Sequence, residues 1–321
     1  MKIAYLAKAR PDLQARIPKD VQSVILEAGP GGVYSEAALK QVADVDALVV
    51  SMEPVNEQIL AACKKLRIVQ RLGVGYETLD LEAAAQRRIP CCNIEGVNKE
   101  AVAEHGMALI LALSKRLLEA DRLTRAAKWN DARVLSGHNF ELAGKTLGII
   151  GLGNTGSSLA RRAKALEMKV IYNDVRAIDP HVLEETGARF AEKDELFRSA
   201  DIVSVNTDLS AQSANMIDAR ALSLMQPHAL LVCCARGGIV DEPALRDALN
   251  AGKIAGAGID VFDPEPILKD NALLSAKNII VTSHVAGVTD ETTQRIFDWA
   301  HENIRRVLRG EKPRWVRNGV Q

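Results

Sequence analysis

The segment Thr146-Leu-Gly-Ile-Ile-Gly151-Leu-Gly153-Asn154-Thr155-Gly156 runs from an apolar strand into a glycine-rich turn, and residues 157–167 after it have a helical pattern. In such a segment Gly151 allows a tight turn, Gly153 lets the backbone approach a pyrophosphate, and Gly156 lets the helix pack closely on the strand. The free N–H groups at the start of the helix would face the anion. The segment therefore predicts a dinucleotide-binding site.

An acidic residue follows the next predicted strand, residues 168–172. Asp174 stands about 20 residues beyond the glycines, where a carboxylate binds the ribose 2′-hydroxyl of NAD. Because a carboxylate there disfavours the 2′-phosphate of NADP, we predict NAD as the cofactor. Arg176 lies two residues further on and could accept a 2′-phosphate. We favour a solvated surface arginine at this position.

The composition is that of a two-domain globular protein. The chain has 321 residues, of which 47% are apolar, enough for each of two domains to build its own core. Its 41 basic and 41 acidic residues give a net charge of zero. We therefore expect neither nucleic acid nor an anionic membrane as a partner.

The first residues, Met1-Lys-Ile-Ala-Tyr-Leu-Ala, predict a short strand and lack the pattern of a signal peptide. No apolar run reaches the roughly 18 residues that span a bilayer. We expect a cytoplasmic protein.

The five cysteines lie at positions 63, 91, 92, 233 and 234. They form no Cys-x-x-Cys pair and no cluster with histidines at zinc-ligand spacing, so we predict no metal site. We expect reduced thiols that act as small buried hydrophobes rather than redox groups.

Apolar runs alternate with helical segments along most of the chain, which predicts parallel sheets with helices on their faces. The predicted strands of the first half are residues 3–7, 21–26, 47–51, 67–72 and 90–94, with helices at 35–42, 56–64 and 79–86. After the glycine turn, strands are predicted at 168–172, 202–205, 229–234, 254–261 and 278–282, with helices at 193–198, 213–224 and 242–251.

A long apolar helix is predicted over residues 99–122, between these two series of strands. Residues 123–144 show no clear periodicity, and we interpret them as a connecting or oligomer-contacting segment. A last helix, residues 291–309, is expected to return to the first domain and make it discontinuous.

Three groups capable of chemistry follow successive predicted strands of the second sheet: Arg236, Glu265 and His284. Ligands of open α/β sheets bind outside the carboxyl ends of the strands. A guanidinium can bind a carboxylate through two hydrogen bonds, and a histidine beside a carboxylate can exchange a proton near neutral pH. Together these groups suit hydride transfer to a 2-keto acid.

Each group taken alone has a plainer explanation. Arg236 could be a surface cation, Glu265 a loop carboxylate before Pro266, and His284 an interior histidine with satisfied hydrogen bonds. Coincidence is a poor explanation for all three at the ends of successive strands in a dinucleotide-binding sheet.

Six motifs, spread over nearly the whole chain, match one known family. They are Gly151-Leu-Gly-Asn-Thr-Gly156 with Asp174, Ala235-Arg-Gly-Gly-Ile-Val-Asp-Glu242, Asp260-Val-Phe-Asp-Pro-Glu-Pro266, His284-Val-Ala-Gly287, Gly73-Val-Gly-Tyr-Glu-Thr-Leu-Asp80 and Asn98-Lys-Glu-Ala-Val-Ala-Glu104. With them the chain resembles the NAD-dependent D-isomer specific 2-hydroxyacid dehydrogenases.

The resemblance implies an α/β protein of two doubly wound parallel-sheet domains with an interdomain cleft. A flavodoxin-like substrate-binding domain would comprise residues 1–98 plus 288–321, and a Rossmann dinucleotide-binding domain residues 99–287. The family is usually homodimeric, so we expect a homodimer.

The resemblance also implies roles for individual residues. Arg236 would bind the substrate's carboxylate and carbonyl oxygen, His284 would donate the proton in reduction, and Glu265 would orient His284. Asp260 would hold the nicotinamide carboxamide, and backbone N–H groups at Val74 and Gly75 would hold the substrate's carboxylate. The implied cofactor-binding residues are Gly151, Gly153, Asn154, Thr155, Gly156, Asp174, Cys234, Ala235, Asp260 and Gly287.

The chain departs from its relatives at three informative positions. Ser283 replaces the proline common before the catalytic histidine, and we expect activity to survive this change. Phosphoglycerate-specific members carry an arginine near Val50, and phosphite-oxidising members a lysine at Val74, so we expect neither activity. Met52 and Glu53 are expected to line the pocket for the substrate's side chain.

The leading hypothesis is an enzyme that uses NADH to reduce a small 2-keto acid, such as glyoxylate, hydroxypyruvate or pyruvate, to the D-hydroxy acid, or that runs the reverse reaction. The alternative is an NAD-sensing, corepressor-like binding protein on the same fold, which the catalytic residues alone do not exclude. Zero net charge and the lack of long disordered tails argue against it.

Overall fold

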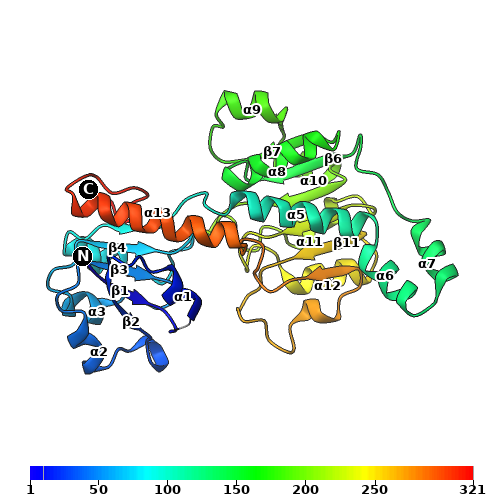
Figure 1. Ribbon diagram of the computed structural model, residues 1–321. Coiled ribbons are helices and arrows are strands. Elements are labelled where there is room, and N and C mark those ends of the chain that lie inside the picture. Colours follow the sequence, from blue (N-terminus) through cyan, green and yellow to red (C-terminus); the bar gives the residue numbers. More distant parts are fainter. Residues whose placement is uncertain (10, 321) are drawn as a thin grey trace. The chain divides into compact units, whose positions relative to one another are not determined.

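The computed structural model describes residues 1–9 and 11–320. The chain divides into two compact units, Met1–Val97 with Thr289–Gln321, and Asn98–Val288. Their junctions lie within one residue of the domain boundaries that the sequence suggests. Each unit is an α/β sandwich around one parallel sheet (Figure 1). This confirms the predicted fold class of two parallel sheets with interleaved helices.

The first sheet has the strand order β2-β1-β3-β4-β5, which is the flavodoxin-like order. Its strands are β1 Lys2–Leu6, β2 Gln22–Leu26, β3 Ala47–Val50, β4 Ile68–Arg71 and β5 Cys91–Cys92. All four residues of β3 are buried. A strand of continuous apolar residues is covered on both faces, as parallel sheets require.

Helices cover both faces of the first sheet. Helices α2 Glu36–Gln41, α3 Glu57–Ala62 and α4 Leu81–Gln86 form one core with it, while α1 Pro11–Arg16 and α13 Asp290–Leu308 form the other. Asn56 and Asp80 cap the helices that follow them, because the side chain of Asn56 accepts the Ile59 N–H and that of Asp80 accepts the Ala83 N–H. A short 3-10 helix, η1, covers Pro30–Gly32.

The second sheet has the order β12-β11-β10-β9-β6-β7-β8, a Rossmann arrangement extended by one strand. Its strands are β6 Thr146–Ile150, β7 Lys169–Asn173, β8 Arg189–Phe190, β9 Ile202–Val205, β10 Leu230–Cys233, β11 Gly256–Ile259 and β12 Ile279–Val281. The strand order reverses between β6 and β9. Ligands of such sheets bind at this switch point.

Helices also cover both faces of the second sheet. One core lies beneath α5 Lys99–Ser114, α8 Asn154–Ala165 and α9 Pro180–Thr186. The other lies beneath α10 Lys193–Ser199, α11 Ala219–Leu224 and α12 Glu242–Asn250. The 3-10 helix η2, Ala272–Ser275, packs on this second core through Leu273.

The single helix predicted over residues 99–122 is wrong. The chain instead forms α5 and then α6, Leu117–Arg125, because Arg116 between them adopts a left-handed φ of 49°. A further helix, α7 Trp129–Ser136, lies in the segment where the sequence showed no periodicity. Figure 1 shows α6 and α7 standing apart from the sheet of their unit, beyond the end of α5. We call residues 117–136 the arm.

The five cysteines are free thiols, as predicted, and four of them are buried. Burial raises the pKa of the Cys63, Cys91 and Cys92 thiols to about 12 and that of Cys233 to about 11. Thiols with such raised pKa values are inert near neutral pH. Among the described residues, no group of three or more His, Cys, Asp or Glu side chains could hold a metal ion. No helix among residues 1–9 and 11–320 is long and apolar enough to cross a membrane.

Asp201, just before β9, links the start of β6 to His228 at the edge of the second sheet opposite the glycine turn. Its carboxylate accepts the Thr146 N–H at 2.8 Å and lies 2.7 Å from His228 Nε2. Burial alone would raise the pKa of Asp201, but the Thr146 N–H, His228 and Lys145 outweigh it and hold the pKa below its ordinary value. Asp201 therefore stabilises the fold as a carboxylate.

We predict that Asp201→Asn lowers the free energy of unfolding by about 1.5–3 kcal/mol at neutral pH, the usual value of hydrogen bonds to a charged group. A carboxyl whose pKa is lowered on folding contributes stability above its unfolded pKa, and this contribution is lost as pH falls through the folded pKa. The deficit of the variant should therefore shrink toward about pH 3, near the ordinary pKa of aspartate. Urea unfolding at both pH values measures it.

Asp270→Asn, at an exposed loop position, is the matched control and should change stability at neither pH. An equal deficit for Asp201→Asn at both pH values would contradict the role of its charge.

Candidate active site

The glycine turn follows β6 at the switch point of the second sheet. Gly151 has a φ of 90°, and a Cβ at Gly156 would lie 2.1 Å from the Gly151 carbonyl oxygen. Only glycine fits at Gly156, which supports the predicted close packing of helix on strand. Helix α8 begins at Asn154, three residues earlier than predicted, and no side chain caps it. Its first N–H groups are therefore available to an anion such as a pyrophosphate.

Asp174 stands at the end of β7, next to this turn. Its carboxylate accepts the Leu152 N–H and the Arg176 N–H, each at 2.9 Å, and the side chain is 4% exposed. Burial alone would raise the pKa of Asp174, but Arg176 and the Leu152 N–H outweigh it and lower the pKa below its ordinary value. Asp174 is therefore an ionised carboxylate at neutral pH.

Arg176 lies at the surface, as the sequence suggested, with 68% of its side chain exposed. Its guanidinium pairs with Asp174, with Nε 3.3 Å from Oδ1. Its Nη2 lies 3.0 Å from the place that a Cβ on Gly153 would occupy, so the side chain covers the glycine turn.

The three residues predicted to do chemistry follow β10, β11 and β12, which are neighbours in the sheet. The loops after β10 and β11 touch directly, because a Cβ on Gly237 would lie 1.8 Å from the Phe262 carbonyl oxygen. Glycine at position 237 thus lets the loop of Arg236 approach the loop of Glu265. Arg236 is half-buried and donates a hydrogen bond from Nη1 to the Ala235 carbonyl at 2.8 Å.

His284 and Glu265 form a hydrogen-bonded pair. His284 Nδ1 lies 2.6 Å from Glu265 Oε2, while Oε1 of the same carboxylate accepts the Phe262 N–H at 3.0 Å. An ionised carboxylate at Nδ1 requires a proton there and leaves Nε2 for other chemistry. The His284 side chain is 46% exposed, so a small molecule can reach it.

Asp260 is fully buried beneath the His284 turn. Its carboxylate accepts the N–H groups of Val285 at 3.0 Å and Ala286 at 2.9 Å, together with the Thr282 hydroxyl at 2.5 Å. Its carbonyl oxygen accepts the His284 N–H at 2.7 Å. In this structure Asp260 fixes the backbone that carries the histidine.

Sequence reasoning missed His105, which belongs to the same network. On α5, its Nε2 lies 3.1 Å from Thr282 Oγ1 and 3.9 Å from Asp260 Oδ1. The sequence offers one signal for it: a polar residue within the apolar helix that follows the Asn98 motif. That signal does not say which strand end the imidazole would meet.

The other residues predicted to bind the cofactor lie along the same edge. Cys234 and Ala235 follow β10 and are half-buried. Gly287 follows the His284 turn, and a Cβ there would lie 2.6 Å from Asn98 Nδ2.

The residues that are predicted to bind the substrate without a catalytic role belong to the first unit. Val74 and Gly75 follow β4, and Met52, 72% exposed, follows β3, the neighbouring strand. Arg71 Nη2 lies 3.4 Å from Met52 Sδ. Glu53 accepts the Ala28 N–H at 3.2 Å and thus anchors a neighbouring loop.

Comparison with known proteins identifies the family. Residues 107–286 match the model of the D-isomer specific 2-hydroxyacid dehydrogenase, NAD binding domain. The chain is 37% identical over 292 residues to glyoxylate reductase of Thermococcus litoralis, covering 89% of this chain and 86% of that one. The chain belongs to the D-isomer specific 2-hydroxyacid dehydrogenase family. It is an NAD-dependent 2-hydroxyacid dehydrogenase, which confirms the resemblance, the reaction class and the cofactor predicted from the sequence.

Two further relatives of this dehydrogenase cover other parts of the family. It is 36% identical over 294 residues to D-3-phosphoglycerate dehydrogenase of Archaeoglobus fulgidus, covering 90% of this chain but 54% of that one. The apo crystal structure of D-mandelate dehydrogenase from Rhodotorula graminis superposes with a TM-score of 0.87 at 26% identity, covering 100% of this chain and 98% of that one.

We predict that Gly156→Ala weakens NADH binding at least about tenfold, which corresponds to 1.4 kcal/mol. The added Cβ collides with the Gly151 carbonyl oxygen and must displace the turn or α8. Titration of NADH by fluorescence or calorimetry measures the change.

Gly106→Ala in α5 is the matched control, because a Cβ there meets no atom within 4 Å. It should bind NADH as the wild type does, and wild-type affinity in Gly156→Ala would refute the close approach.

Proposed function

We propose that this dehydrogenase reduces a small 2-keto acid, of the size of glyoxylate, hydroxypyruvate or pyruvate, to the D-2-hydroxy acid, or runs the reverse reaction. The observation that carries the proposal is the 2.6 Å pair of His284 and Glu265, which follow β12 and β11, while Arg236 follows β10 on the other side of β11. The similarity to a glyoxylate reductase supports a small substrate. The relatives named above are reductases or dehydrogenases, which favours an enzyme over an NAD-sensing corepressor.

The residues at the switch point fit the cofactor. Backbone groups of Gly151, Gly153, Asn154, Thr155 and Gly156 would hold the pyrophosphate, and Asp174 would meet the ribose hydroxyls. The nicotinamide end would lie against Cys234, Ala235 and Gly287, next to the turn that the buried Asp260 holds in place. NADH, when bound, supplies the hydride that reduces C2 of the keto acid.

Arg236 binds the substrate and steadies its developing charge. Its guanidinium can hold the carboxylate and the adjacent carbonyl oxygen at once, because its donors lie in one plane. As C2 is reduced, negative charge grows on that oxygen, and a cation already in place lowers the barrier.

His284 moves the proton. With its Nδ1 proton held by Glu265, the imidazolium donates its Nε2 proton to the carbonyl oxygen, which becomes the hydroxyl. The neutral imidazole accepts that proton in the oxidation direction.

Within the first unit, the proposal concerns the loops that follow β4 and β3. Backbone N–H groups of Val74 and Gly75 bind the substrate's carboxylate, and Met52 borders its side chain. Val50, at the end of β3, stands near the position where phosphoglycerate-specific members carry an arginine, and on that ground we propose a substrate without phosphate. The cation beside it is Arg71, whose Nη1 donates to the Val50 carbonyl at 3.3 Å.

We further propose that the enzyme is a homodimer held together by the arm. Four large apolar side chains there are more than half exposed: Leu117, Leu118, Trp129 and Val134. A monomer rarely leaves such a group in water, and a second copy of the same surface would cover it.

We predict that His284→Ala lowers kcat by about 10²–10⁴, the range of general acid–base catalysis. Its residual rate should lose the pH dependence of the wild type, while NADH still binds with wild-type affinity. Arg236→Ala should likewise lose most turnover and keep NADH binding.

Steady-state rates across pH, together with NADH titrations, test both variants. His181→Ala, on the exposed surface of α9, is the matched control and should keep wild-type rates. A wild-type pH profile in His284→Ala would refute its role.

We predict that Leu118→Glu shifts the protein toward monomer, because a charge in an apolar interface is costly to bury. Light scattering after size exclusion measures the mass. Leu274→Glu, at a residue with similar exposure on η2, should leave the dimer intact. A monomeric wild type would contradict the proposed dimer.

A further inference from the structure

The loop after β4 has its carbonyl groups anchored to a neighbouring segment. The Gly73 carbonyl accepts the Ile94 N–H at 2.8 Å, and the Val74 carbonyl accepts Asn93 Nδ2 at 2.6 Å. Both peptides are trans, so each carbonyl points opposite to the N–H of the next residue. The N–H groups of Val74 and Gly75 are thereby aimed away from residues 93–94. Neither donates to another residue in the described part of the chain.

Asn93 can anchor Val74 only if the NH₂ group of its side-chain amide faces the Val74 carbonyl. Its side chain is fully buried, and its Oδ1 accepts Arg317 Nε at 2.9 Å. A guanidinium can only donate, so the atom that it meets must be the oxygen of the amide. The NH₂ group then faces the Val74 carbonyl. Arg317 thus fixes the orientation of the amide that holds the loop.

Arg317 and Trp315 make two further contacts with the loop after β4. The Arg317 guanidinium lies 5.4 Å from the centre of the Tyr76 ring, within cation–π range, and pairs with Glu95. Trp315 packs with Val74 around the buried side chains of residues 94, 97 and 300.

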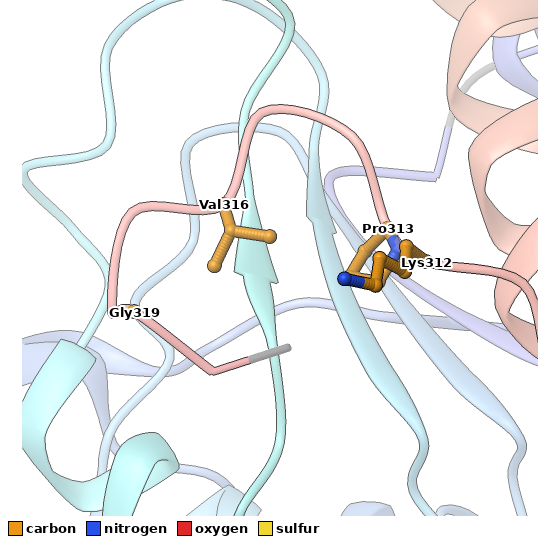
Figure 2. Close-up of a pocket in the computed structure, with 4 residues that line it drawn as sticks. All are labelled: Lys312, Pro313, Val316 and Gly319. Atoms are coloured by element: carbon orange, nitrogen blue, oxygen red, sulfur yellow. The ribbon is translucent and has the colours of Figure 1, made fainter.

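The C-terminal segment that carries Arg317 is itself bonded to the first sheet. Val316 forms an antiparallel bridge with Cys92, and the Arg317 N–H donates to the Cys91 carbonyl at 2.8 Å. Asn318 Oδ1 accepts the Cys91 N–H at 3.1 Å. Figure 2 shows the segment looping past the strands, with Lys312, Pro313, Val316 and Gly319 lining a surface pocket.

We propose that Arg317 is a positioning residue for the substrate. Through Asn93 and Tyr76 it holds the Val74 and Gly75 N–H groups in the orientation that binds the substrate's carboxylate. The inference rests on the proposed function of this loop. Donors fixed before binding lose less entropy when the substrate arrives, so loosening them should weaken substrate binding and leave the cofactor site unchanged.

The test compares Arg317→Ala with the wild type in two independent measurements. We expect the KM for the keto acid to rise about tenfold, equivalent to the loss of about one hydrogen bond to a charged group. The dissociation constant of NADH should not change, and kcat should fall less than KM rises. Hydrogen exchange of the amides of residues 73–76 should accelerate.

Two further variants separate positioning from folding. Asn93→Asp keeps an acceptor for Arg317 but has no donor for the Val74 carbonyl, so it should raise KM as Arg317→Ala does. Arg317→Lys retains a donor for Asn93 and should restore KM in part. Arg309→Ala, at an exposed position just after α13, is the matched control and should behave as the wild type.

A wild-type KM in both Arg317→Ala and Asn93→Asp would overturn the proposal. Failure of the proposed function is separately visible, because the wild type would then reduce no 2-keto acid. In that case hydrogen exchange tests the anchoring by itself. Equal exchange rates for the amides of residues 73–76 in Arg317→Ala and the wild type would show that Arg317 does not anchor the loop.

Discussion

The carboxyl ends of adjacent parallel strands meet at one edge of a sheet, and the chemistry of this enzyme depends on that constraint. Arg236, Glu265 and His284 are far apart in sequence, yet β10, β11 and β12 are neighbours, so their loops leave the sheet side by side. Contact then requires close approach of the backbone, which Gly237 allows against the Phe262 carbonyl. The 2.6 Å pair of His284 and Glu265 lies on this scaffold.

Backbone groups are held by buried polar side chains in both units. In the second unit the Asp260 carboxylate binds two N–H groups of the histidine turn, and His105 extends that network to α5. In the first unit Asn93 holds the Val74 carbonyl. Buried polar groups are costly unless their hydrogen bonds are satisfied, so a full set of partners leaves one arrangement of each turn. This explains how flexible loops can carry accurately placed donors.

The sequence predicted most strands and helices of both sheets because their patterns are local. Strand 202–205 and the caps at Asn56 and Asp80 depend only on neighbouring residues. The break at Arg116 was missed, since a left-handed residue that is not glycine leaves no mark in an apolar pattern. Helix α7 was missed because it is short and its exposed apolar residues Trp129 and Val134 are five positions apart, which does not place them on one helix face.

The candidate residues were recognisable from motifs, whereas the residues that orient them were not. Arg236, Glu265 and His284 follow strands in recognisable patterns, but nothing local connects His105 to Thr282 or Arg317 to Asn93. Those contacts join residues 177 and 224 positions apart and depend on the tertiary fold. The pairing of Arg176 with Asp174 and its place over Gly153 could not be predicted for the same reason, because they are properties of the folded turn.

The most direct test of the account is the rate of NADH oxidation with a panel of 2-keto acids: glyoxylate, hydroxypyruvate, pyruvate, oxaloacetate and branched 2-keto acids, with NADPH in parallel. We predict turnover that favours NADH and the small unphosphorylated acids, with the D-hydroxy acid as product. Tight NADH binding without turnover of any member of the panel would contradict it.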